Sequence, residues 1–150
     1  MFAIIHALLG GIIGLNLNSV WLVIFLSLAS HFLLDMLPHW DGTCGKKPCQ
    51  PNGKLATKKS TLILRFFDFS VAIITIIFLF FQFNNKMLIL GAIFAILPDI
   101  AKIGYLTPLK KSKAYIQYLK FHSIIQKDVS WKLGLTIQLI LLLILIIVLF

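Results

Sequence analysis

The chain has 150 residues, of which 59% are hydrophobic and 13% are charged, and its mean hydropathy is +0.97. This composition excludes an ordinary soluble domain, and the length predicts a single domain over residues 1–150. The formal net charge of +9 comes from lysines that flank apolar runs, a pattern typical of membrane topology signals. We therefore expect contacts with membrane lipids and no nucleic-acid partner.

Long apolar runs recur along the chain and predict an all-α, polytopic membrane protein. Each run approaches the length needed to cross a hydrocarbon core about 30 Å thick. Trp21 and Trp40 bracket the second run, as interfacial aromatic anchors do, and Pro38 should end or kink its helix. Pro98 and Asp99 should interrupt the fourth run. We expect about five transmembrane helices, at residues 2–16, 20–38, 62–83, 87–105 and 133–150.

The polar segments between these runs predict the orientation in the membrane. Residues 41–60 form a loop rich in Lys, Gly and Pro. Residues 109–128 place Lys113 and Lys120 on one helical face and His122 on the opposite face, which predicts an amphipathic helix lying at the interface. Because lysine-rich segments stay in the cytoplasm, the N-terminus should lie inside and the C-terminus outside.

The most informative stretch runs from Ser30 to Asp41, at the end of the second apolar run. It contains His31, Asp35, His39 and, as its last residue, Asp41. His31 and Asp35 are four residues apart and share one helix face, and His39 follows after another four. Ionisable groups within a membrane are costly unless they are paired, hydrated or metal-bound. This stretch is therefore a candidate functional site.

Further ionisable side chains are expected at the same depth on the cytoplasmic side, which predicts one shared metal site. Imidazole and carboxylate ligands suit Zn best, with Mn or Fe as alternatives, and their number allows one divalent ion or two. A non-ligating carboxylate would act as the general base. The leading ligands are His31, Asp35, His39, Asp99 and His122, followed by His6, and the candidate bases are Asp41 and Asp68.

The same residues carry a resemblance to known families. His6, the Ser30–Asp41 stretch, Leu97-Pro98-Asp99 and His122 resemble the small bacterial membrane-bound metal-dependent hydrolases. In addition, His31-x-x-x-Asp35 followed by Pro38-His39 is similar to the pattern of the zinc-dependent phospholipase C and S1/P1 nuclease family, whose substrates are phosphodiesters. The resemblance implies a hydrolase of the bacterial inner membrane that acts on a phosphoester or lipid-derived substrate.

Simpler interpretations stay open for the individual residues. His31 alone can be a hydrogen-bonding group between helices. Asp68 can pair with Arg65, and Asp99 can pair with Lys102. Taken together, the same groups can also form a structural metal site or a proton or ion pathway in a non-enzymatic transport or assembly protein.

Cys44 and Cys49 lie in the 41–60 loop, which the charge pattern assigns to the cytoplasm. A reducing compartment argues against a stable disulfide between them. Because the chain has only two cysteines, a separate zinc knuckle lacks its second pair of ligands. We expect free thiols.

Overall fold

The computed structural model describes residues 1–40, 59–102 and 107–150, and within these ranges the chain is almost entirely helical. The predicted all-α class is therefore confirmed. The helices are α1 (Ala3–Asn16), α2 (Val20–Asp35), α3 (Lys59–Phe83), α4 (Lys86–Ala101), the 3-10 helix η2 (Pro108–Lys111), α5 (Lys113–Ile125) and α6 (Trp131–Leu149).

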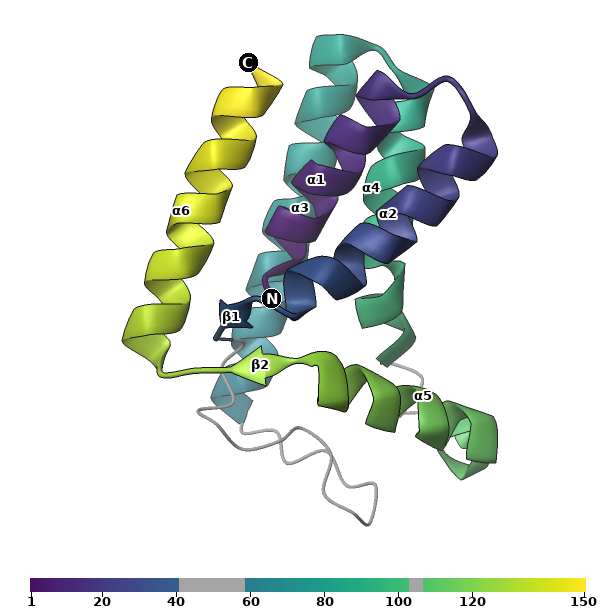
Figure 1. The fold of residues 1–150 in the computed structure, drawn as a ribbon, viewed down its shortest axis with the longest axis vertical. Coiled ribbons are helices and arrows are strands. Elements are labelled where there is room, and N and C mark those ends of the chain that lie inside the picture. The colour runs from purple at the N-terminus through teal and green to yellow at the C-terminus, as the bar shows by residue number, and fades with distance from the viewer. Residues whose placement is uncertain (41–58, 103–106) are drawn as a thin grey trace.

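Helices α1 to α4 form the main bundle, α6 stands beside it, and α5 lies across one end (Figure 1). The closest packing joins α1 to α4, where glycines let the two backbones approach. A Cβ atom added to Gly14 would lie 2.0 Å from the carbonyl oxygen of Met87, and one added to Gly91 would lie 2.0 Å from that of Gly10. These glycines therefore fix the depth at which α1 sits against α4.

Two helices of the described chain, and not five, are long and apolar enough to cross a membrane. They are Ile63–Phe83 within α3 and Trp131–Leu149, and only 11% of each apolar window is buried within the protein. Ala3–Asn16 has 14 residues and Val20–Asp35 has 16, so each spans only about 21–24 Å. The predicted count of five spans is therefore wrong, because an apolar run does not fix the length of its helix, and these shorter helices pack mainly against one another and α4.

The two prolines near helix ends behave differently. Helix α2 ends at Asp35, three residues before Pro38, as the sequence predicts. Helix α4, in contrast, continues through Pro98 to Ala101. The predicted interruption of the fourth run is therefore wrong, because proline removes only one hydrogen-bond donor and the helix tolerates that loss near its end. Asp99 thus projects from a continuous helix.

A two-residue parallel pairing, which the sequence did not predict, connects the end of α2 to the segment between α5 and α6. Strand β1 (Pro38–His39) pairs with β2 (Lys127–Asp128), and the backbone N–H of Val129 donates to the carbonyl of His39. Helix α6 packs closely on β1 at Gly134, where an added Cβ would lie 2.5 Å from the backbone nitrogen of Trp40. This pairing ties α5 to the end of the bundle.

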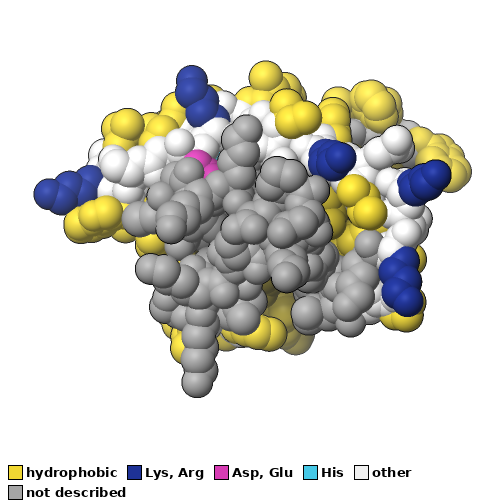
Figure 2. Space-filling view, turned by 90° about the horizontal axis from the view of Figure 1, so that it is seen from below, with side chains coloured by type: hydrophobic (Ala, Val, Ile, Leu, Met, Phe, Trp, Pro, Cys, Tyr) yellow, Lys and Arg dark blue, Asp and Glu magenta, His cyan; other side chains and the backbone are white. Residues whose placement is uncertain are grey.

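The amphipathic segment expected at 109–128 begins as η2, continues as α5 and ends in β2. On α5, Lys113 and Lys120 are exposed whereas His122 is buried, in line with the two predicted faces. Figure 2 shows the molecule from the end that α5 crosses, and Lys and Arg side chains are spread around the surface seen there. Asp41 and most of the 41–60 loop, including Cys44 and Cys49, lie outside the described residues.

Candidate metal centre

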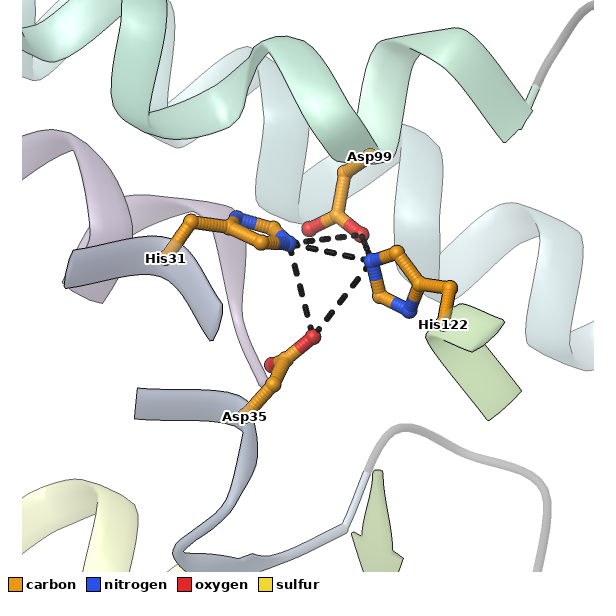
Figure 3. A group of neighbouring side chains, drawn as sticks. All are labelled: His31, Asp35, Asp99 and His122. Carbon is orange, nitrogen blue, oxygen red and sulfur yellow. Dashed lines mark hydrogen bonds and ion pairs between the residues drawn. The ribbon is translucent and has the colours of Figure 1, made fainter. Parts of the chain in front are cut away.

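Four side chains from three helices converge at the end of the bundle that α5 covers (Figure 3). His31 and Asp35 come from successive turns of α2, Asp99 comes from α4, and His122 comes from α5. One potential ligand atom from each lies within 4.8 Å of the others. The structure therefore brings together four of the residues that the sequence suggests as metal ligands, across 91 positions of the chain.

The distances among these atoms suit a single small cation. The Nε2 atoms of His31 and His122 are 3.0 Å apart, and Asp35 Oδ2 lies 3.4 and 3.6 Å from them. Two ligands of a tetrahedral ion with bonds of 2.0–2.1 Å are about 3.4 Å apart. Asp99 Oδ1 is farther away, at 4.0 and 3.8 Å from the same two nitrogens. Three atoms thus form a tight face, and Asp99 closes the group more loosely.

A hydrogen bond fixes the orientation of the His31 ring. Its Nδ1 lies 2.8 Å from the carbonyl oxygen of Ala95 in α4. Because a carbonyl only accepts, Nδ1 carries the proton and Nε2 presents its lone pair to the centre. Backbone carbonyls hold the metal-binding histidines of many proteins in this way. The same bond joins α2 to α4, so the structural role considered for His31 is compatible with a metal-binding role.

The two remaining histidines face the other oxygen of Asp35. His6 of α1 is fully buried, stacks on His31 with ring centroids 4.2 Å apart, and has its Nε2 3.3 Å from Asp35 Oδ1. His39, in β1, has its Nε2 3.9 Å from the same oxygen. Its Nδ1 lies 2.8 Å from the carbonyl of Leu37 and must donate to it. All four histidines therefore surround one carboxylate.

Two ammonium groups accompany the carboxylates. Lys102 Nζ lies 2.6 Å from Asp99 Oδ1, which is the pairing considered from the sequence. The amino group of Met1 lies 2.8 Å from Asp35 Oδ1, and both partners are fully buried. Sequence reasoning missed this second contact, since no motif signals it. Both contacts favour the ionised carboxylates that metal binding requires.

Helix α5 covers the centre and is anchored by its tyrosines. The hydroxyl of Tyr118 donates to the carbonyl of Pro98, and that of Tyr115 donates to the carbonyl of Lys102, 3.0 Å away. Burial, together with the charge of Lys102, lowers the pKa of His122 from 6.5 to about 4. At neutral pH this imidazole is therefore uncharged, which is the form that binds metals.

The predicted base Asp68 lies apart from the four-residue group. Its Oδ2 accepts from the backbone N–H of Ala3 at 2.6 Å, and its Oδ1 accepts from that of Ile4 at 3.4 Å. It thus pairs with backbone donors at the start of α1 that have no partner within the helix. Gln138 of α6, which sequence reasoning missed, accepts from the N–H of Phe2 and donates to the carbonyl of Trp40. Asp68 and Gln138 thus hold the start of α1, and hence His6, in place.

Comparisons with known proteins add no assignment to this geometry: no family model, no curated protein and no solved structure matches the chain.

Proposed function

We propose that this protein is a membrane-embedded, metal-dependent hydrolase. The observation that carries the proposal is the tight face formed by His31, Asp35 and His122, with ligand atoms 3.0–3.6 Å apart. Two imidazoles and a carboxylate are a frequent ligand set of hydrolytic zinc, and a water completes the coordination there. Zn is the proposed ion, with Mn or Fe as alternatives.

The looser position of Asp99 supports catalysis over purely structural binding. Its Oδ1 already accepts from Lys102 at 2.6 Å, so an ion on the tight face can keep a position for water on this side. Asp99 and Lys102 are also the more exposed members of the site, with side-chain exposures of 11% and 22%. A divalent ion lowers the pKa of a coordinated water and so supplies a nucleophile at neutral pH.

Charge supports an anionic substrate. The two carboxylates are offset in part by Lys102, and a divalent ion would leave the centre with net positive charge. A phosphoester carries the opposite charge, and Lys102 is placed to pair with its oxygens. We therefore propose a phosphoester or lipid-derived substrate, as the family resemblance also implies.

The apolar helices support a membrane location. The two long helices expose large apolar side chains, among them Phe66 and Phe81 of α3 and Ile147 of α6, which are 74–78% exposed. Lipid tails would cover such surfaces. We propose that the centre lies near the cytoplasmic face of the bacterial inner membrane, with the N-terminus inside and the C-terminus outside, because the lysine-bearing helix α5 covers it.

Asp41 and Asp68 receive different roles in this proposal. Asp68 is committed to the backbone donors of Ala3 and Ile4, so we assign it to positioning α1. Asp41 follows His39 by two residues in the sequence and stays the proposed general base.

A structural metal clamp is the second candidate function, and burial favours it. His31 and Asp35 are fully buried and His122 is 1% exposed, as in closed structural sites. Such a clamp would join α2, α4 and α5 without catalysis, in a transport or assembly protein.

Hydrolysis assays separate the two functions. The purified protein, loaded with Zn, is assayed with phosphatidylglycerol vesicles and with bis-p-nitrophenyl phosphate, alongside His31→Ala and a matched Ser27→Ala control from the same helix. We expect metal-dependent turnover that His31→Ala abolishes and Ser27→Ala retains. Bound Zn without turnover of either ester would contradict the hydrolase and favour the clamp.

A further inference from the structure

We propose that the centre holds two divalent ions bridged by the two oxygens of Asp35, with Asp99 Oδ2 as a ligand of the second ion. This inference builds on the proposed hydrolase and specifies a second cation subsite, formed on the His6 and His39 side of Asp35. The first subsite is the tight face described above.

The carboxylate oxygens are divided between two sets of imidazoles. Asp35 Oδ2 faces His31 and His122, whereas Asp35 Oδ1 lies 3.3 Å from His6 Nε2 and 3.9 Å from His39 Nε2. Asp99 repeats the division, since its Oδ1 faces the first pair.

The other oxygen of Asp99, Oδ2, lies 4.0 Å from His6 Nε2. A carboxylate that presents one oxygen to each of two sets of ligands is the arrangement that bridges paired ions, which lie about 3.5–4 Å apart.

His6 supplies an independent reason for a ligand in this subsite. The side chain is 0% exposed, and neither ring nitrogen makes a hydrogen bond within the described chain. A buried polar atom without a hydrogen-bond partner destabilises the folded protein. A cation bound by Nε2, Asp35 Oδ1 and Asp99 Oδ2 would satisfy this ring, in the same direction in which it already faces.

The orientation of His39 fits the same role. Because its Nδ1 donates to the carbonyl of Leu37, its Nε2 is the unprotonated nitrogen of the neutral ring, and this atom faces Asp35 Oδ1. Pairing of β1 with β2 fixes the backbone that carries this ring. The second subsite therefore has two imidazole nitrogens, from His6 and His39, and two carboxylate oxygens, Asp35 Oδ1 and Asp99 Oδ2.

The amino group of Met1 is the competing partner for this subsite. It lies 2.8 Å from Asp35 Oδ1, so an ion bound there must replace this contact or take the uncharged amine as a ligand. An ammonium group that keeps the oxygen would leave the centre with one ion. The stoichiometry of bound metal distinguishes these two states.

The test uses the full chain in detergent micelles, freed of metal and then titrated with Mn²⁺. Bound metal is counted by mass spectrometry, and electron paramagnetic resonance reports whether two Mn²⁺ ions are magnetically coupled. We expect two ions per chain and a coupled signal. In His6→Ala we expect about one ion and an uncoupled signal, while Ser27→Ala keeps both ions.

The outcomes separate this inference from the proposed function. One ion per chain in the unmodified protein, without coupling, overturns the second subsite and leaves a mononuclear hydrolase possible. No bound ion overturns both. If His6→Ala does not fold, the coupled signal of the unmodified protein still decides the question, because bridged ions alone give it.

Discussion

The Nε2 atoms of His31 and His122 face each other at 3.0 Å, although one residue lies on α2 and the other on α5. The contact is a hydrogen bond when the Nε2 of His122 carries its proton, and a cation bound by both nitrogens would take the place of that proton. The Nδ1 of His31 is already the donor to Ala95, so its Nε2 is an acceptor. The pair is therefore the geometric basis of the candidate metal centre.

Metal removal should loosen the contact between α5 and the bundle. Helix α5 is held by His122, by two tyrosine hydroxyls and by the β1–β2 pairing. A ligand that binds the folded state at 100 times its Kd stabilises it by about 2.7 kcal/mol. We expect EDTA to lower the melting temperature and to raise hydrogen exchange in residues 113–125. An unchanged exchange pattern in α5 would show that metal does not hold this helix.

The α1–α4 contact predicts opposite effects for two neighbouring glycines. In Gly14→Ala the added Cβ meets the backbone oxygen of Met87 at 2.0 Å, which should cost about 1–3 kcal/mol. In Gly11→Ala the nearest atom is Leu88 Cγ at 3.5 Å, an ordinary contact, and the better helix propensity of alanine should stabilise by up to about 1 kcal/mol. Thermal unfolding in detergent measures both. Equal effects of the two substitutions would refute the close packing of these helices.

Removal of the Asp68 carboxylate should destabilise the start of α1 without removing metal. Asp68→Ala leaves the backbone donors of Ala3 and Ile4 unsatisfied, at a cost of about 1–2 kcal/mol. Asp68→Asn keeps one accepting oxygen and should lose less. The measurements are the unfolding temperature and the metal content of each variant. If Asp68→Asn folds normally but loses all turnover, Asp68 is the general base after all.

His122 should make the stability of the metal-free protein depend on pH. Its pKa is about 4 in the folded protein and near 6.5 in an unfolded chain. Above pH 6.5 the imidazole is uncharged in both states, so it adds no pH dependence. Between pH 6.5 and 4 only the unfolded chain binds the proton, so stability falls as the pH is lowered, by at most about 1.4 kcal/mol per unit. Unfolding of His122→Gln in EDTA should lack this component, and identical pH profiles would contradict it.

The sequence predicted which residues converge at the candidate site better than it predicted the number of membrane-spanning helices. The i,i+4 spacing of His31 and Asp35 places both on one helical face, and the cost of burying charge in an apolar chain pointed to Asp99 and His122. The number of spans was overestimated because composition alone does not tell a short helix packed on its neighbours from one that crosses lipid.

Long-range contacts account for most of what the sequence did not predict. The pairing of Pro38–His39 with Lys127–Asp128 is too short to leave a periodic pattern. The contacts of Gln138 and Met1 depend on where α1 begins relative to α6 and α2. Neither residue type signals such a partner by itself.

The most direct test of the central claim is the metal content of the purified protein and of two variants. His31→Ala and Asp99→Ala change different helices, α2 and α4, and Ser27→Ala serves as the folded control. A shared centre predicts at least one Zn per chain in the unmodified protein and in Ser27→Ala. We expect a strong loss of Zn in His31→Ala and a smaller loss in Asp99→Ala, because Asp99 is the more distant ligand. Full occupancy in both ligand variants would contradict a metal centre built from these residues.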